Sequence, residues 1–209
     1  MVGRIIQTLE CVAEGADWLA ATEPRFAHAL PLVAPLRLRR QADGFTALLD
    51  AIVGQQVSVA SARAIWARME AAGLTGQAAV AEAREEDLRA AGLSRQKARY
   101  ARALATAGID FDALRAAPDR DVVARLVQVP GIGTWTAEIY AMFALGRADV
   151  FAAGDLALQE GAKVLFGLEN RPTERELRAM AQVWSPWRSV AARILWAYYH
   201  VAKSREGIR

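Results

Sequence analysis

A short glycine-rich turn most constrains what this chain can fold into. Residues 130–133 read Pro-Gly-Ile-Gly and predict a tight hairpin between two helices, over about 119–127 and 134–145. Glycine lets the backbone turn sharply and approach a partner that a Cβ would hold off. The amides around Gly131 and Gly133 would then open the second helix, where N–H groups and the helix dipole favour a phosphate.

Composition indicates an all-α protein. The chain has 209 residues, of which 54% are apolar and 23% charged. Alanine, leucine and arginine dominate, β-branched runs are few, and no strand or internal repeat is predicted. No apolar run is long enough to span a membrane and no signal-peptide pattern opens the chain, so we expect a cytoplasmic protein without a membrane partner.

The scarcity of cysteine and histidine excludes several kinds of site. Cys11 is the one cysteine, so neither an intramolecular disulfide nor an iron–sulfur cluster is expected. The two histidines, His28 and His200, are far apart in the sequence, which argues against a metal centre. A net charge of +3 permits nucleic-acid binding without diagnosing it, since a GC-rich genome would enrich arginine equally well.

Caps and apolar spacing divide the rest of the chain into helices. The first forty residues predict one or two helices ending at Pro31 and Pro35. A basic run at 37–40 follows, typical of a solvated face that could lie near phosphates. The further helices are expected over 45–53, 58–72, 77–81, 85–91, 95–107, 119–127, 134–145, 155–166, 173–184 and from 185 onward.

Four segments together resemble a known family. Residues 52–60, 92–98, 126–137 with Asp155, and 184–188 match, in order, helix-hairpin-helix DNA glycosylases of the AlkA type, the 3-methyladenine DNA glycosylases II. The resemblance covers roughly residues 18–200. It implies one glycosylase domain over 1–209 made of two interleaved helical lobes, with the hairpin and Asp155 at their cleft. The middle lobe would span about 45–145, and the N- and C-terminal segments would form the other lobe. The N-terminal β lobe of longer relatives would be absent.

Asp155 is the candidate catalytic residue. Taken alone, an aspartate that opens a helix is usually only its N-cap. In the resembling enzymes the matching aspartate faces the flipped nucleotide. There a fixed carboxylate stabilises the oxocarbenium character of the sugar and can orient water. Cationic bases such as 3-methyladenine and 7-methylguanine need little further protonation to leave.

Two tryptophans are the candidate walls of a base pocket. Trp135 and Trp196 match aromatic residues that line this pocket in the family, and an indole face attracts a cationic purine. The alternative for both is ordinary core packing. Relatives with lyase activity carry a lysine at the position of Trp135, so the resemblance implies a monofunctional enzyme.

The remaining candidates would contact DNA or a cation. Gln55 and Gln56 lie where the family places the wedge that fills the vacated base stack, although some relatives carry leucine at position 56 and a plain helix turn stays an alternative. The hairpin would bind a DNA phosphate through main-chain N–H groups near Gly131, Gly133 and Thr136. No cofactor is required, but the family also binds a structural sodium or potassium ion at the hairpin. Its ligands would be the carbonyls of Val127, Val129 and Ile132.

The resemblance therefore implies a monomeric base-excision repair enzyme of the bacterial nucleoid that removes alkylated bases from double-stranded DNA. Two alternatives stay open on the sequence: a hairpin module that binds DNA without catalysis, and an all-α interaction protein with no DNA role. The lesion range is open as well, since hypoxanthine, ethenoadenine and methylated pyrimidines would also fit an open pocket.

Overall fold

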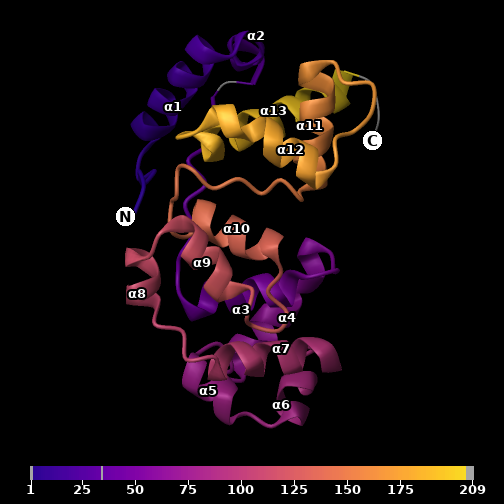
Figure 1. Ribbon diagram of the computed structural model, residues 1–209. Helices are drawn as coiled ribbons and strands as arrows, with labels where there is room; N and C mark the ends of the chain where they lie inside the picture. Colours follow the sequence, from indigo (N-terminus) through magenta and orange to yellow (C-terminus); the bar gives the residue numbers. More distant parts are fainter. Residues whose placement is uncertain (1, 34, 206–209) are drawn as a thin grey trace. The chain divides into compact units, whose positions relative to one another are not determined.

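The predicted all-α class is confirmed. The computed structural model describes residues 2–33 and 35–205, and within them there is no strand, only an isolated antiparallel bridge between Ile5 and Arg147 (Figure 1). The α-helices are α1 Leu9–Thr22, α2 Pro24–Val33, α3 Phe45–Gly54, α4 Val59–Ala71, α5 Gln77–Glu82, α6 Glu85–Ala90, α7 Arg95–Thr106, α8 Phe111–Ala116, α9 Asp119–Leu126, α10 Thr134–Phe143, α11 Leu156–Phe166, α12 Glu174–Met180 and α13 Arg188–Arg205. None of the helices in these ranges is long and apolar enough to cross a membrane.

The chain forms two compact units. The first unit comprises residues 41–140, and the second combines residues 2–40 with residues 141–209. Helices α3 to α9 and most of α10 therefore belong to the first unit, and α1, α2 and α11 to α13 to the second. The second unit is built from two segments that are distant in the sequence.

The core of the first unit forms where α3 packs against α7, which also contacts α5 and α6. Leu48, Leu49, Ile52 and Val53 repeat along one face of α3 and are completely buried. This apolar stripe fixes the orientation of α3, and with it the position of the Gln55–Gln56 turn that follows the helix.

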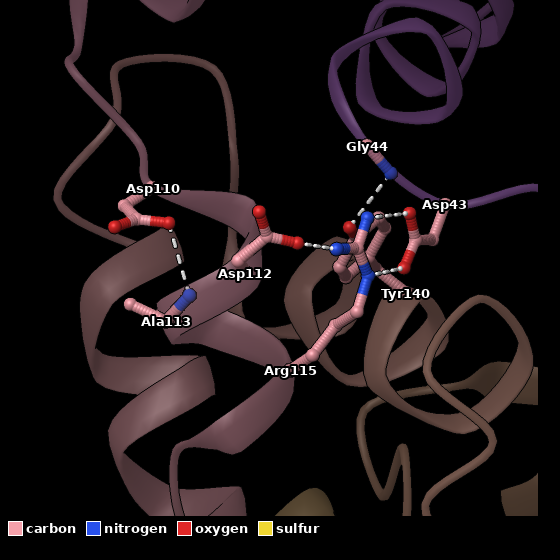
Figure 2. Close-up of polar contacts among 7 residues, drawn as sticks. All are labelled: Asp43, Gly44, Asp110, Asp112, Ala113, Arg115 and Tyr140. Atoms are coloured by element: carbon pink, nitrogen blue, oxygen red, sulfur yellow. Dashed lines mark hydrogen bonds and ion pairs between the residues drawn. The ribbon is translucent and has the colours of Figure 1, made fainter.

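A polar network in the first unit ties the segment before α3 to α8 and α10 (Figure 2). The guanidinium of Arg115 donates to both carboxylate oxygens of Asp43, at 2.6 and 2.9 Å, and also to Asp112. The N–H of Gly44 donates to the hydroxyl of Tyr140 at 2.9 Å. Burial raises the pKa of Tyr140 to about 12, so the phenol stays neutral. Helix α8, which carries Arg115, was not among the expected helices.

The second unit is organised around α13, which contacts α1, α2 and α11. Trp184 is 2% exposed and contacts three phenylalanine rings, with ring centroids 5.2 to 5.6 Å away: Phe26, Phe151 and Phe166. Gly161 lets α11 approach α13 closely, since a Cβ there would lie 2.6 Å from the carbonyl oxygen of Leu195. These contacts hold Asp155, at the start of α11, against the last helix.

Most expected helix starts agree with the structure. The side chains of Ser58, Ser94 and Thr173 each cap the helix that follows, and Thr173 forms the predicted capping box with Glu176. Gly167 ends α11 in the left-handed conformation. Here the local signal is sufficient because a cap needs only one side chain and the adjacent backbone.

Two predictions that depended on proline were wrong. Pro31 lies inside α2 and does not end it. The last helix begins at Arg188 and not at Ser185, because the N–H of Ser189, which would donate to Ser185 in a helix that began there, donates to the carbonyl of Ala148 at 2.8 Å. The Ser185 hydroxyl donates to Asp149 at 2.8 Å. The preceding helix also ends at Met180, and residues 181–184 form a 3₁₀ turn that places Trp184 in the core.

Candidate active site

Hydrogen bonds from two helices of the second unit hold Asp155. Its Oδ1 accepts from the backbone N–H groups of Ala157 and Leu158 at 2.9 and 3.1 Å, which makes it the N-cap of α11. The indole N–H of Trp196, on α13, donates to the same oxygen at 3.0 Å. Capping alone would not require the third bond. The carboxylate is half-buried and its orientation is fixed from two helices.

Trp196, predicted as a wall of the base pocket, also packs in the second unit and orients Asp155. The side chain is only 8% exposed, its ring packs against Phe143 at 5.7 Å, and its N–H orients Asp155. The guanidinium carbon of Arg39 lies 5.7 Å from the ring centroid, within cation–π range. The structure therefore brings two of the predicted site residues, Asp155 and Trp196, into direct contact.

The hairpin of the first unit needs its two glycines for different reasons. Gly131 adopts a φ of +93°, and a Cβ there would lie 2.3 Å from Cγ of Tyr100. Gly133 has no positive φ, and a Cβ there would meet nothing within 4 Å. Gly131 is thus required by packing inside the unit, whereas Gly133 leaves room for a partner outside it.

This difference gives a testable prediction. Gly131→Ala should lower the free energy of unfolding by about 1–3 kcal/mol, because the substitution adds both backbone strain and overlap with Tyr100. Gly133→Ala is the matched control and should change stability by no more than about 0.5 kcal/mol. Urea unfolding of both variants measures the two values, and equal losses would contradict this account of the hairpin.

Gln55 and Gln56 are placed differently although they are adjacent. The side-chain amide of Gln55 donates to the carbonyl of Gly131 at 2.8 Å, so it fastens the hairpin to the end of α3. Gln56 is exposed and adopts a φ of +54°, an uncommon value for a residue with a Cβ. Of the two, Gln56 is the residue positioned to reach outward.

A cavity of about 510 Å³ in the first unit collects several of the predicted residues. Gln55, Gln56, Trp135 and Thr136 all line it. Trp135 is 47% exposed, so this indole is not a core residue. Asp50, which no sequence motif indicated, also lines this cavity. Partial shielding from water raises the pKa of Asp50.

A second cavity, of about 610 Å³, borders the hairpin of the first unit and is lined by its residues 129–133. Lys97 also lines this cavity, and its ammonium donates to the carbonyl of Val53 at 2.7 Å. Burial lowers the pKa of Lys97. A positive charge and a glycine turn therefore meet at one concave surface, which suits an anionic ligand.

Comparison with known proteins identifies the family. Residues 49–187 match the model of the HhH-GPD superfamily base excision DNA repair protein. The chain belongs to this superfamily. The matched region contains the hairpin, Asp155 and the cavity residues from Asp50 onward, so the predicted family membership is confirmed.

Individual HhH-GPD relatives agree with this assignment. A crystal structure of DNA-3-methyladenine glycosidase from Bacillus halodurans is 31% identical, with a TM-score of 0.81, covering 92% of this chain and 91% of that one. The Schizosaccharomyces pombe 3-methyladenine DNA glycosylase in complex with abasic DNA is 26% identical, with a TM-score of 0.75, covering 88% and 95%.

A third relative is matched over less than half of its own length. The putative DNA-3-methyladenine glycosylase YfjP of Bacillus subtilis is 34% identical over 56% of this chain. The match spans 42% of the length of that relative.

Proposed function

We propose that this HhH-GPD protein is a monofunctional DNA glycosylase that removes alkylated bases from double-stranded DNA. The observation that carries the proposal is the geometry of Asp155, whose carboxylate is fixed by α11 and by the indole of Trp196. The names of the relatives from Bacillus halodurans and Schizosaccharomyces pombe support the substrate class. No comparison supports the alternative of a binding module without catalysis.

Asp155 would act on the sugar. Breaking the N-glycosidic bond leaves positive charge on the ring oxygen and C1′ of the deoxyribose, and a preorganised carboxylate stabilises that charge without reorienting during the reaction. The base departs with the bonding electron pair, which a cationic alkylated base accepts readily. Water then adds to C1′ and loses a proton to the solvent, which leaves an abasic site. Tryptophan at position 135 cannot form a Schiff base with the sugar, so the strand would remain intact.

The cavity that contains Trp135 would receive the base. Its indole offers an electron-rich face, and the carboxylate of Asp50 adds a negative charge to the same cavity. Both features favour a positively charged purine over a neutral one.

The charge of Asp50 can be tested directly. Asp50→Asn should slow release of 7-methylguanine by about tenfold, which corresponds to one weak ion pair, because the neutral amide no longer attracts the cation. Release of the neutral base hypoxanthine should change by less than about twofold, which is the size of a small surface effect. Single-turnover rates on two matched duplexes measure both values. Equal slowing of the two lesions would show that Asp50 does not select for charge.

The hairpin would hold DNA. Main-chain N–H groups near Gly131, Gly133 and Thr136 would bind a phosphate, and the open space around Gly133 supports close approach of the backbone. Val127, Val129 and Ile132 line the hairpin cavity, and their carbonyl oxygens would be the ligands of a sodium or potassium ion. Such an ion would add positive charge where the phosphate binds and would be structural. Gln56 would be the wedge.

The experiment that tests the proposed function uses methylated duplex DNA. The protein should release free 3-methyladenine and 7-methylguanine, and the strand should break only after alkali treatment. Strand breakage without alkali would contradict the monofunctional assignment. Duplex binding without base release would favour the non-catalytic hairpin module, and no duplex binding at low salt would favour the interaction protein.

A further inference from the structure

A cavity in the second unit takes its polar lining from basic side chains. It has a volume of about 450 Å³ and lies between the segment after α2 and the helix α13. We call it the basic pocket; within the described residues it is lined by Val33, Pro35, Leu36, Arg37, Arg39, Arg193, Ala197 and His200. Among these described residues the lining has no carboxylate that could neutralise the arginines.

Arg193 is the buried group of the basic pocket. The residue is only 3% exposed. Its guanidinium donates to the carbonyl and hydroxyl of Ser189 at 2.8 and 2.6 Å, and to the carbonyl of Leu38 at 3.1 Å. Its Nε is buried and has no hydrogen-bond acceptor among the residues that the structure describes. A buried donor without a partner is unfavourable, so the protein itself satisfies the buried charge of Arg193 only in part.

The neighbouring charges also favour an anion. Burial, together with the positive charges of Arg39 and Arg40, lowers the pKa of Arg193 to about 10. Arg193 therefore remains positively charged at neutral pH, and the positive charges of this cluster repel one another. A bound anion would reduce this repulsion.

The basic pocket is connected to Asp155 within the second unit. Arg193 fastens the carbonyl of Leu38, and this fixes the backbone between Arg37 and Arg39. The guanidinium of Arg39 lies over the ring of Trp196, whose N–H donates to Asp155. A single indole therefore separates the arginine cluster from the candidate catalytic carboxylate.

We propose that the basic pocket binds a phosphate group of the DNA backbone, next to the nucleotide whose sugar faces Asp155. This inference rests on the proposed function. Arginine presents several donors in a planar fork, which matches the oxygens of a phosphate. The arginines would also offset the repulsion between the phosphate and the carboxylate of Asp155.

The salt dependence of DNA binding tests the proposal. Arg37 is exposed and lines the pocket, so Arg37→Gln should fold normally. Fluorescence anisotropy measures binding to a duplex that contains a tetrahydrofuran abasic analogue, at KCl concentrations between 50 and 300 mM. The measured values give the slope of log Kd against log salt concentration. Arg37→Gln should reduce this slope by about one, because one phosphate contact is lost, and Arg37→Glu should weaken binding further. Arg175→Gln, an exposed arginine on α12 of the same unit, is the matched control and should leave the slope unchanged.

A second measurement distinguishes DNA from free phosphate. Inorganic phosphate is titrated against the full chain at constant ionic strength while the melting temperature is followed. An unchanged slope in Arg37→Gln overturns the proposal, and a melting temperature that then rises with phosphate only in the parent protein assigns the pocket to a free phosphate. A reduced slope without any base release would support the pocket while contradicting the proposed glycosylase. Normal base release with an unchanged slope would support the proposed glycosylase and contradict phosphate binding in the basic pocket.

Discussion

Replacing Asp155 with asparagine should slow the release of 3-methyladenine from methylated duplex DNA by about a hundredfold or more. Asparagine is as good an N-cap as aspartate, and its side-chain oxygen can accept the same N–H groups from Ala157, Leu158 and Trp196. The substitution therefore removes the negative charge and keeps the local structure. Counting freed bases under single-turnover conditions measures the loss, and affinity for the duplex should be retained.

The chain offers a matched control for this substitution. Asp110 is also an N-cap, accepting from the N–H of Ala113 at 3.0 Å at the start of α8 (Figure 2). Asp110→Asn should release bases at the parent rate. If Asp155→Asn were as active as the parent protein, the catalytic assignment would be wrong and Asp155 would be only a helix cap.

The largest expected effect on stability is that of Trp184→Ala. Its indole is almost fully buried and contacts the rings of Phe26, Phe151 and Phe166, so truncation leaves a large cavity in the second unit. The free energy of unfolding should fall by about 3–5 kcal/mol. Urea unfolding monitored by circular dichroism measures this loss.

Trp135→Ala is the comparison for Trp184→Ala. The indole of Trp135 is 47% exposed, so its removal should cost about 1 kcal/mol or less. The same variant should lose base release, because the indole is the proposed wall of the base cavity. Equal destabilisation by the two substitutions would place Trp135 in the core and remove the support for that cavity.

Local signals in the sequence predicted helix starts better than helix ends or proline positions. Ser58 and Ser94 cap the expected helices because capping involves only one turn of backbone. Ser185 resembles the same signal, but its hydroxyl donates to Asp149, a residue 36 positions earlier in the chain. A distant partner of this kind leaves no trace in the local pattern. Helix α8 was missed although Asp110 caps it, and Arg115 on that helix bonds to Asp43, far away in the sequence.

By itself, the sequence determined the helical class and the hairpin, because both depend on residue types at short spacing. The resemblance of four segments to one family indicated that family and Asp155 as the candidate catalytic residue. Only the tertiary structure decided what those residues contact. In the folded chain the indole N–H of Trp196 donates to Asp155, and the side-chain amide of Gln55 donates to the hairpin carbonyl of Gly131. The tertiary structure also placed Asp50 in the cavity with Trp135 and buried Arg193 among other arginines. The physical reason is that burial and hydrogen-bond partners depend on elements far apart along the chain, whose approach no local pattern records.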